Sequence, residues 1–268
     1  MQNLNILPEN RRRGSKPRCH WITHGDPDVV AARLSAIIAP WGTVSPTDHW
    51  MPQGFLNIEE AELHKAPRLL DDAVRSELKS WWLKIARGKQ TTPSFDIAST
   101  CTVRGSSRRG ILLVEAKAHH SELVNEEGGK RLAIEHSPDQ AKNHTHIAEA
   151  IAEANRQLAA ATGEPWQLSR DTCYQMSNRF ATACKLTSLG YPVILVYLGF
   201  TGAEDVADLG RPLEATSDWF QAVLMHSSAL FPLQIWNHVL TVHGQPFVAG
   251  VRTTSIRHDQ PIVEFVVR

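Results

Sequence analysis

The feature that most restricts the possible folds of this chain is a pair of apolar segments with two helical segments between them. Residues 110–118 read Gly-Ile-Leu-Leu-Val-Glu-Ala-Lys-Ala, and residues 191–200 read Tyr-Pro-Val-Ile-Leu-Val-Tyr-Leu-Gly-Phe. Runs that are apolar on both faces are typical of strands inside a sheet that is covered on both sides. Between them, apolar residues recur at helical spacing over about 145–161 and 171–189. This order predicts an α/β fold with a mixed central sheet flanked by helices.

Further elements surround these two strands. Residues 94–103 form a strand-like run, and the basic, glycine-containing segment 104–109 joins it to the first apolar strand as a hairpin turn. Weak strands are expected near the C-terminal end. Helical spacing predicts three more helices, at about 26–39, 59–87 and 217–230, of which the second is interrupted near Pro67.

The chain is therefore expected to have four parts. These are a basic flexible arm at 1–20, a helix and connector at 21–58, a core at 59–200, and a C-terminal helix with strands at 201–268 packed on the core. The arm holds five basic residues against one acid and little apolar surface. Such a segment is either a solvated, mobile terminus or an electrostatic arm for a phosphate backbone.

Composition excludes several classes of protein. Hydrophobic residues make up 42% of the chain and charged residues 21%, which is ordinary for a globular domain and excludes a disordered, collagen-like or coiled-coil protein. The 28 basic and 28 acidic residues give a formal net charge of zero. A general basic coat is therefore absent, and local patches would have to hold any nucleic acid.

The cysteines and the N-terminal residues indicate the cellular compartment of the protein. The four cysteines, Cys19, Cys101, Cys173 and Cys184, are scattered and contain no Cys-x-x-Cys pair. This argues against a zinc ribbon or thioredoxin-like chemistry. No apolar run follows the first basic residues, so we expect no signal peptide, and the longest apolar run is too short to span a bilayer. The expectation is a soluble, reduced, cytoplasmic protein with no membrane partner.

One group of residues indicates a catalytic or metal-binding site. Side chains alternate between the two faces of a strand, so Glu115, Lys117 and His119 lie on the same face. The hairpin can bring Asp96, on the preceding strand, beside that face. Two carboxylates at one spot repel each other, so a divalent cation or the lysine must compensate them. Hard oxygen ligands favour magnesium or manganese.

These segments resemble a known family. Ser-Phe-Asp-Ile-Ala at 94–98 and Leu-Val-Glu-Ala-Lys at 113–117 resemble the motif of the PD-(D/E)xK, or restriction-endonuclease-like, nuclease superfamily. The resemblance covers roughly residues 59–200 and implies a restriction-endonuclease-like core with N-terminal helical and C-terminal β extensions. In one respect the chain departs from the family, which usually has a strand before the one bearing the aspartate. Residues 88–93 leave little room for it.

The resemblance also implies roles for individual residues. Asp96 and Glu115 would bind Mg²⁺ or Mn²⁺, the Ala116 carbonyl would be a third ligand, and Lys117 would position and activate the attacking water. Many members add a glutamate from the preceding helix. Glu77 is the best match, because it falls inside the apolar arc of the helix predicted over 59–87.

Other basic and polar residues are candidates for contacting nucleic acid. The turn of the hairpin contains Arg104, Arg108 and Arg109, which could hold a phosphate backbone. Gln175 and Arg179 are four residues apart, so they lie on one side of their predicted helix. In some nucleases of this kind, residues at that place point toward the site. A plain polar pair at the helix edge is the alternative.

Together these features predict a metal-dependent nuclease that hydrolyses phosphodiester bonds in DNA, with RNA also open as a substrate. Restriction, repair and defence all fit, and cutting both strands would favour a homodimer. One alternative is a catalytically inactive nucleic-acid- or protein-binding module of the same fold. Another is an assembly factor, which zero net charge and eight tryptophans would suit. A third is that Glu115 and Lys117 form an ordinary pair on a solvated strand end.

Overall fold

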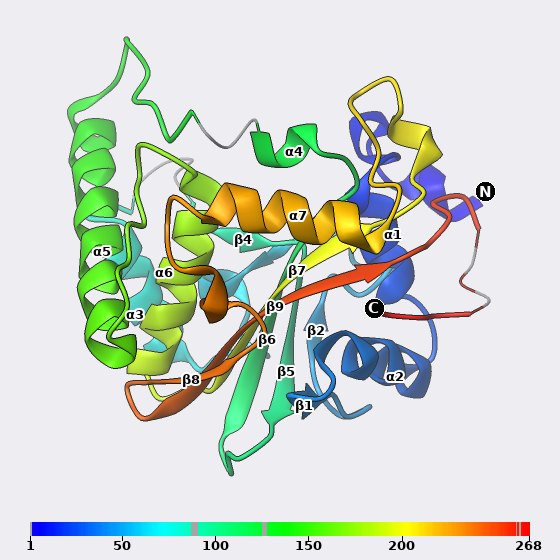
Figure 1. Cartoon of the computed structure of the whole chain (residues 1–268), viewed down its shortest axis with the longest axis horizontal. Coiled ribbons are helices and arrows are strands. Elements are labelled where there is room, and N and C mark those ends of the chain that lie inside the picture. Colours follow the sequence, from blue (N-terminus) through cyan, green and yellow to red (C-terminus); the bar gives the residue numbers. More distant parts are fainter. Residues whose placement is uncertain (1, 87–90, 125–127, 261, 263) are drawn as a thin grey trace.

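The structure, a computed structural model, describes residues 2–86, 91–124, 128–260, 262 and 264–268. The strands of its main sheet are β1 (Gly42–Thr43), β2 (Trp50–Met51), β5 (Ile97–Val103), β6 (Arg109–Lys117), β7 (Val193–Phe200), β8 (Val239–Val242) and β9 (Gln245–Thr254). Within the described residues they form a seven-stranded sheet in the order β1-β5-β6-β7-β9-β8, with β2 also paired to β5 (Figure 1). Two further strands, β3 (Ala61–Glu62) and β4 (Ser94–Phe95), pair with each other.

Helices lie on both sides of the main sheet. The α-helices are α1 (Ser15–Ile22), α2 (Pro27–Ile38), α3 (Asp72–Trp82), α4 (Ser121–Val124), α5 (Pro138–Thr162), α6 (Tyr174–Ser188) and α7 (Thr216–Ser227). Short 3₁₀ segments occur at Gln2–Ile6, Glu9–Arg11, Leu63–Lys65, Glu204–Val206 and Leu233–Ile235.

The strand directions make the sheet mixed. β5 and β6 form an antiparallel hairpin in which Ile97 is opposite Val114. β6 and β7 are parallel, and the chain between them includes α5 and α6. β9 lies parallel to β7 on its other side, and β8 is antiparallel to β9 at the edge. The predicted α/β architecture with a mixed central sheet flanked by helices is confirmed.

Alternating side chains divide the core into two layers. Leu113 of β6 and Leu195 of β7 pack with apolar residues of α3, α5, α6 and α7. The neighbouring residues Leu112 and Ile194 face the other way and pack with α1 and α2. All four are fully buried, and burial of such a side chain contributes about 1.5–3 kcal/mol relative to its exposure. Figure 1 shows the resulting arrangement, with α5 and α6 on one side of the strands and α2 on the other.

The helix between the two central strands begins earlier than its apolar pattern predicts. α5 starts at Pro138 rather than near residue 145. Ser137 caps it: its hydroxyl accepts from the Gln140 N–H at 3.2 Å, and the Gln140 side chain accepts from the Ser137 N–H at 2.7 Å. Such a capping box satisfies two backbone donors that the first turn would otherwise leave unpaired. The first turns of α5 therefore need no apolar face to form.

The prediction of a helix over 59–87 is wrong for its first half. Residues Ala61–Glu62 form β3, which pairs with β4 so that Ala61 is opposite Phe95. The α-helix starts only at Asp72, after Asp71, whose side chain accepts from the Val74 N–H at 2.9 Å. Pairing with a strand more than 30 residues away outweighs the local helical pattern.

The strand expected before the aspartate comes from the segment predicted to be a connector. β1 and β2 both pair antiparallel with β5, with Gly42 opposite Val103 and Trp50 opposite Ser99. Residues 40–58 thus supply the strand positions for which residues 88–93 had no room. Residues 87–90 lie outside the described residues.

The N-terminal segment is not the loose arm that its composition predicts. α1 begins at Ser15 and contacts β6, and Ile22 is fully buried. Upstream of α1, Leu7 is also buried, at 1% exposure. The prediction is wrong because acidic residues far along the chain neutralise Arg13 and Arg18, which the segment's own composition cannot reveal.

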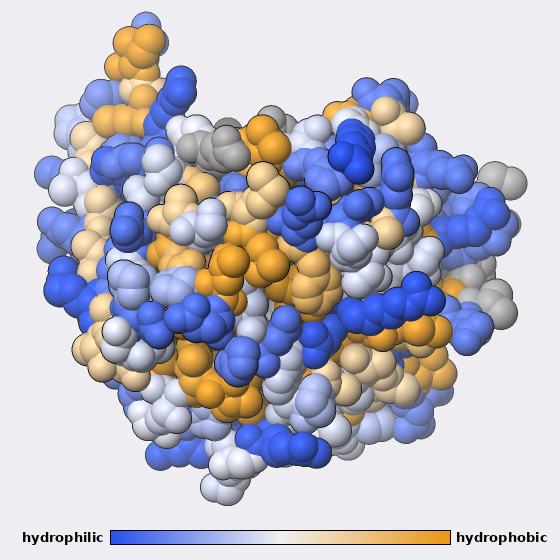
Figure 2. All heavy atoms as spheres, in the orientation of Figure 1, coloured by the Kyte–Doolittle hydropathy of each residue, from blue (hydrophilic) through white to orange (hydrophobic). Residues whose placement is uncertain are grey.

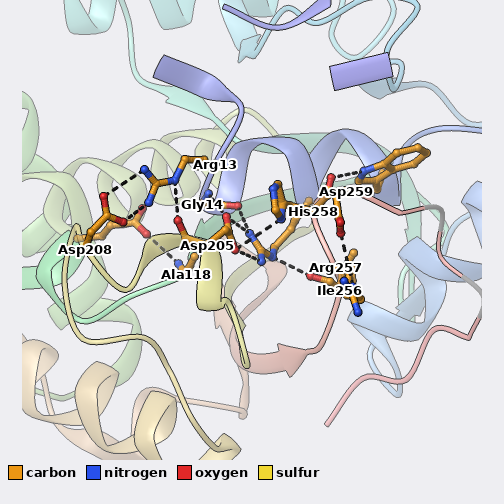
Figure 3. A network of polar contacts seen from close by, with 12 residues as sticks. Arg13, Gly14, Ala118, Asp205, Asp208, Ile256, Arg257, His258 and Asp259 are labelled. Carbon is orange, nitrogen blue, oxygen red and sulfur yellow. Dashed lines mark hydrogen bonds and ion pairs between the residues drawn. The ribbon is translucent and has the colours of Figure 1, made fainter. Parts of the chain in front are cut away.

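Asp205 is the centre of these contacts (Figure 3). It accepts from the Gly14 N–H at 3.0 Å and from Nη2 of the buried Arg18 at 2.5 Å. On the surface beside it, Arg13 pairs with Asp208. Burial alone would raise the pKa of Asp205, but the hydrogen bonds from Arg18 and Gly14 outweigh it and lower the pKa to about 2. This cluster fixes the start of α1 against the loop that follows β7.

The remaining surface is mixed. Figure 2 shows hydrophilic side chains over much of one face, with apolar side chains gathered in its middle, around α7. α7 carries one strongly exposed apolar residue, Met225. Scattered apolar surface of this kind is ordinary for a globular protein.

Candidate active site

The β5–β6 hairpin holds Asp96 at the end of β6. Asp96 lies between β4 and β5, and its N–H donates to the carbonyl oxygen of Val114 at 3.0 Å. In return, the Ala116 N–H donates to Asp96 Oδ2 at 2.8 Å. Ala116 separates Glu115 from Lys117 along the strand. The structure thus brings Asp96, Glu115 and Lys117 into the lining of one pocket of about 170 Å³.

Glu115 and Lys117 project from the same face of β6 and meet α6. Lys117 Nζ lies 2.7 Å from Glu115 Oε1 and donates to Gln175 Oε1 at 2.8 Å. Arg179 Nε donates to Glu115 Oε2 at 2.6 Å. Glu115 is 2% exposed and Lys117 5%, so this pair is not on a solvated strand end. The helical spacing of Gln175 and Arg179 directs both side chains into the pocket.

Lys16 and Glu60 also line the pocket, and neither was predicted from the sequence. Lys16, on α1, places its Nζ 2.6 Å from Asp96 Oδ1 and 2.7 Å from Glu60 Oε1. Glu60 directly precedes β3, and its Oε2 accepts from the Ser94 hydroxyl at 3.1 Å. Glu60 was hidden in a segment that reads as helix, and Lys16 in one that reads as a mobile arm. Only the packing of α1 and the pairing of β3 with β4 bring them to the pocket.

Glu77 lies elsewhere. It is exposed on α3, and its carboxylate pairs with Lys185 Nζ at 2.8 Å. The residues of α3 that are buried are Leu78 and Trp82, one helical turn apart. The predicted apolar arc included residues before and after the real helix, and Glu77 is about 100° away from Leu78. The assignment of Glu77 to the site is therefore not supported, and Glu60 is the carboxylate that the structure places there.

The cations of the pocket keep its acids ionised. Burial raises the pKa of Asp96, but Lys16 and Lys117 outweigh it and hold that pKa below its usual range. Burial also raises the pKa of Glu60, but the effect of Lys16 is larger, so the net pKa is below its usual value. For Arg179, burial lowers the pKa, yet the contact with Glu115 gives a net rise. At neutral pH these groups are charged and paired.

A fourth carboxylate lines the pocket beside Lys117. Glu122, at the start of α4, accepts from the Ala118 N–H at 2.8 Å. Burial raises its pKa above the usual range. His119 Nε2 lies 3.5 Å from Glu122 Oε1, so the histidine contacts a residue of the pocket lining. The lining thus holds four acids (Glu60, Asp96, Glu115, Glu122) and three cations (Lys16, Lys117, Arg179).

The chemistry of these donors suits a hard divalent cation. Carboxylate and carbonyl oxygens are the ligands that magnesium and manganese prefer. Within the part of the chain that the structure describes, no group of three His, Cys, Asp or Glu side chains is close enough to hold a metal as it stands. Instead, the Lys16 ammonium bridges Asp96 and Glu60. A positive charge thus already lies between two carboxylates. A divalent cation that replaced the ammonium would meet the same oxygen ligands, so the residues fit such a cation.

The hairpin arginines are distant from the pocket. Arg109 begins β6 and Lys117 ends it, and eight residues at ~3.3 Å each separate them by about 26 Å. Arg104, Arg108 and Arg109 are all exposed. Arg108 Nη1 donates to the Gly190 carbonyl at 3.2 Å, and Arg109 Nη2 donates to the Thr100 hydroxyl at 2.9 Å. Any contact they make with a substrate is therefore remote from the pocket.

Two broader observations complete the description. Among the described residues, no helix combines the length and apolar character that crossing a membrane requires. Comparison of the chain with family models, with characterised proteins and with solved structures gave no match. The functional interpretation therefore depends on the pocket and its chemistry.

Proposed function

We propose that this protein is a nuclease of the PD-(D/E)xK type that uses Mg²⁺ or Mn²⁺ to hydrolyse phosphodiester bonds, with DNA as its substrate. The observation that carries the proposal is the pocket formed by Asp96, Glu115 and Lys117 at the end of one β-hairpin. The two carboxylates supply oxygen ligands of the kind that Mg²⁺ and Mn²⁺ prefer, and the ammonium supplies a preorganised positive charge beside them.

The order of elements supports a restriction-endonuclease-like core. A helix, α3, precedes the β5–β6 hairpin, which bears the acidic residues, and β1 and β2 add the strand positions on the far side of β5. Helices α5 and α6 then lead to β7, which is parallel to β6. A helix before the hairpin, and helices and a strand after it, are what the resemblance of the two motif segments implies.

Each residue of the pocket has a role in this proposal. Asp96 and Glu115 would hold the cation together with the Ala116 carbonyl, and Glu60 would take the role that the resemblance implied for Glu77. When bound, the cation supplies Lewis-acid polarisation of the phosphate and a lowered pKa for water. Arg179 fixes the Glu115 carboxylate from the side opposite Lys117.

Lys117 would act on the substrate. Its ammonium is held by Glu115 and Gln175 at 2.7 and 2.8 Å, so its position is set before any substrate arrives. A preorganised positive charge stabilises the negative charge that develops on the phosphate oxygens in the transition state. Burial strengthens this effect, because little water screens the charge.

A cleavage assay tests the proposal. Purified protein is incubated with plasmid DNA, single-stranded DNA and RNA, with Mg²⁺, Mn²⁺ or EDTA, beside Asp96→Asn. Asparagine keeps an oxygen that can accept from the Ala116 N–H while removing the charge. We expect cation-dependent cleavage by the wild type and a loss of at least about 100-fold in the variant.

The matched control is Asp28→Asn on the exposed start of α2, which should cleave like the wild type. If the wild type cleaves none of the substrates with either cation, the non-catalytic binding module becomes the better interpretation. Cleavage by Asp96→Asn at the wild-type rate would place the active site elsewhere.

The hairpin gives a separate prediction about binding. Replacing Arg104, Arg108 and Arg109 by glutamine should weaken DNA binding and flatten its salt dependence. Each lost phosphate contact lowers the slope of log K against log salt by ~0.9, so up to about three units are expected. Fluorescence anisotropy at several salt concentrations measures this slope. Neutralising the exposed Lys142 and Arg156 on α5 is the control, and an unchanged slope in the hairpin variant would show that DNA does not contact the hairpin.

A further inference from the structure

Lys16 occupies the space between two carboxylates of the pocket. Its Nζ contacts Asp96 Oδ1 at 2.6 Å and Glu60 Oε1 at 2.7 Å. The Asp96 side chain is 6% exposed and that of Lys16 32%. The lysine therefore reaches inward from the rim and covers oxygens that the proposed cation would need. An ammonium and a divalent cation at the same two oxygens would repel each other, so the two compete for them.

Charge holds the lysine at these oxygens. Burial lowers the pKa of Lys16, but Asp96 and Glu60 outweigh it and leave the pKa above its usual range. The ammonium is thus held between two carboxylates, and a cation that takes those oxygens has to displace it.

The backbone under Lys16 is anchored. Two residues before it, the Gly14 N–H donates to Asp205 (Figure 3). Two residues after it, the buried Arg18 pairs with the same carboxylate. Arg18 Nε also donates to the Ile256 carbonyl at 2.8 Å. The flexible four-carbon stem of a lysine can nevertheless swing about a fixed backbone. Exchange would thus be a side-chain movement toward solvent, with α1 held in place.

We propose that Lys16 is a built-in competitor for the divalent cation: its ammonium occupies the Asp96 and Glu60 oxygens in the metal-free protein and is displaced when the cation binds. This inference rests on the proposed metal site and names its regulation. The lysine keeps the acids neutralised in the metal-free protein and lowers the affinity for the cation. Binding of the cation and exposure of the Lys16 ammonium to solvent then occur together, and either one can be measured.

Calorimetric titration with Mn²⁺ and Mg²⁺ tests this. If the oxygens are free of Lys16 only 1–10% of the time, Lys16→Met should bind the cation about 10–100-fold more tightly than the wild type. Lys16→Arg, which keeps the charge, should stay close to the wild type, and Lys16→Gln should resemble Lys16→Met. The control is Lys65→Met, which removes a nearby ammonium that pairs with Glu62 instead.

A second measurement uses the wild type alone. Mass spectrometry can follow the rate of reductive methylation of the Lys16 amine, which should rise at least about tenfold when saturating Mg²⁺ displaces it. An unchanged rate, or equal cation affinity in wild type and Lys16→Met, would overturn the competition while leaving the metal site standing. Absence of cation binding in every protein would overturn the metal site itself, and the inference with it.

Discussion

Replacing Lys117 by methionine is expected to slow phosphodiester cleavage by at least about 100-fold, the effect typical of removing one preorganised charge. Methionine keeps most of the aliphatic stem and removes only the ammonium that Glu115 and Gln175 hold. Cleavage of labelled DNA with saturating Mg²⁺, followed over time, measures the loss. Lys142→Met, on the exposed side of α5, is the control and should cleave normally.

Two companion measurements separate chemistry from structure. Calorimetry should show that Lys117→Met still binds the cation, since the lysine is not a ligand. Thermal melting should show a fold close to that of the wild type, because Arg179 continues to neutralise Glu115. A lowered melting temperature with a normal rate for the protein that remains folded would instead make Lys117 a structural residue.

Asp205→Ala is expected to produce the largest loss of stability. The substitution leaves the guanidinium of Arg18, whose side chain is 2% exposed, without its acidic partner. Breaking such a buried pair from one side typically costs about 3–5 kcal/mol. In a domain of this size that corresponds to a fall in melting temperature on the order of 10 °C. Urea unfolding at neutral pH gives the free energy directly.

The neighbouring acid provides the control. Asp208 pairs with Arg13 on the surface, and Asp208→Ala should unfold like the wild type because exposed ion pairs contribute little. Equal stability of the Asp205 and Asp208 variants would show that the buried contact does not stabilise the fold.

The same contact has a pH dependence of defined sign. The folded-state pKa of Asp205 is about 2, below its ordinary value of 3.8. A carboxylate with a lowered pKa stabilises the fold fully above its unfolded-state pKa, and this stabilisation is lost as the pH falls through the folded-state value. The difference in unfolding free energy between wild type and Asp205→Ala should therefore shrink from about pH 4 to pH 2.

Local patterns predicted the centre of the fold and failed at its margins. Periodicity and alternation located the hairpin, the strand at 193–200 and the helices around it, because burial on both faces leaves a strong signal in the sequence. Strands β1, β2 and β3 are two residues each, too short to show any periodicity. Their formation depends on partners that come later in the chain, β4 and β5.

The same distinction applies to the pocket. Asp96, Glu115 and Lys117 lie on one hairpin, so spacing and alternation suffice to bring them together. Lys16 and Glu60 come from segments before α3, and only the packing of α1 and the pairing of β3 place them there. Glu77 was chosen from an arc that included residues outside the real helix, which rotated the apparent buried face.

The length of β6 also sets a scale for the duplex DNA proposed as the substrate. The hairpin turn and the pocket lie at opposite ends of this strand, about 26 Å apart. A B-form duplex advances ~3.4 Å per base pair, so this span corresponds to about eight base pairs, roughly three quarters of a helical turn. In a duplex that runs parallel to β6 over the protein surface, with its scissile bond at the pocket, the arginines would therefore meet a different side of the backbone. Oligonucleotides that end fewer than about eight base pairs from the cut would be held by the pocket alone.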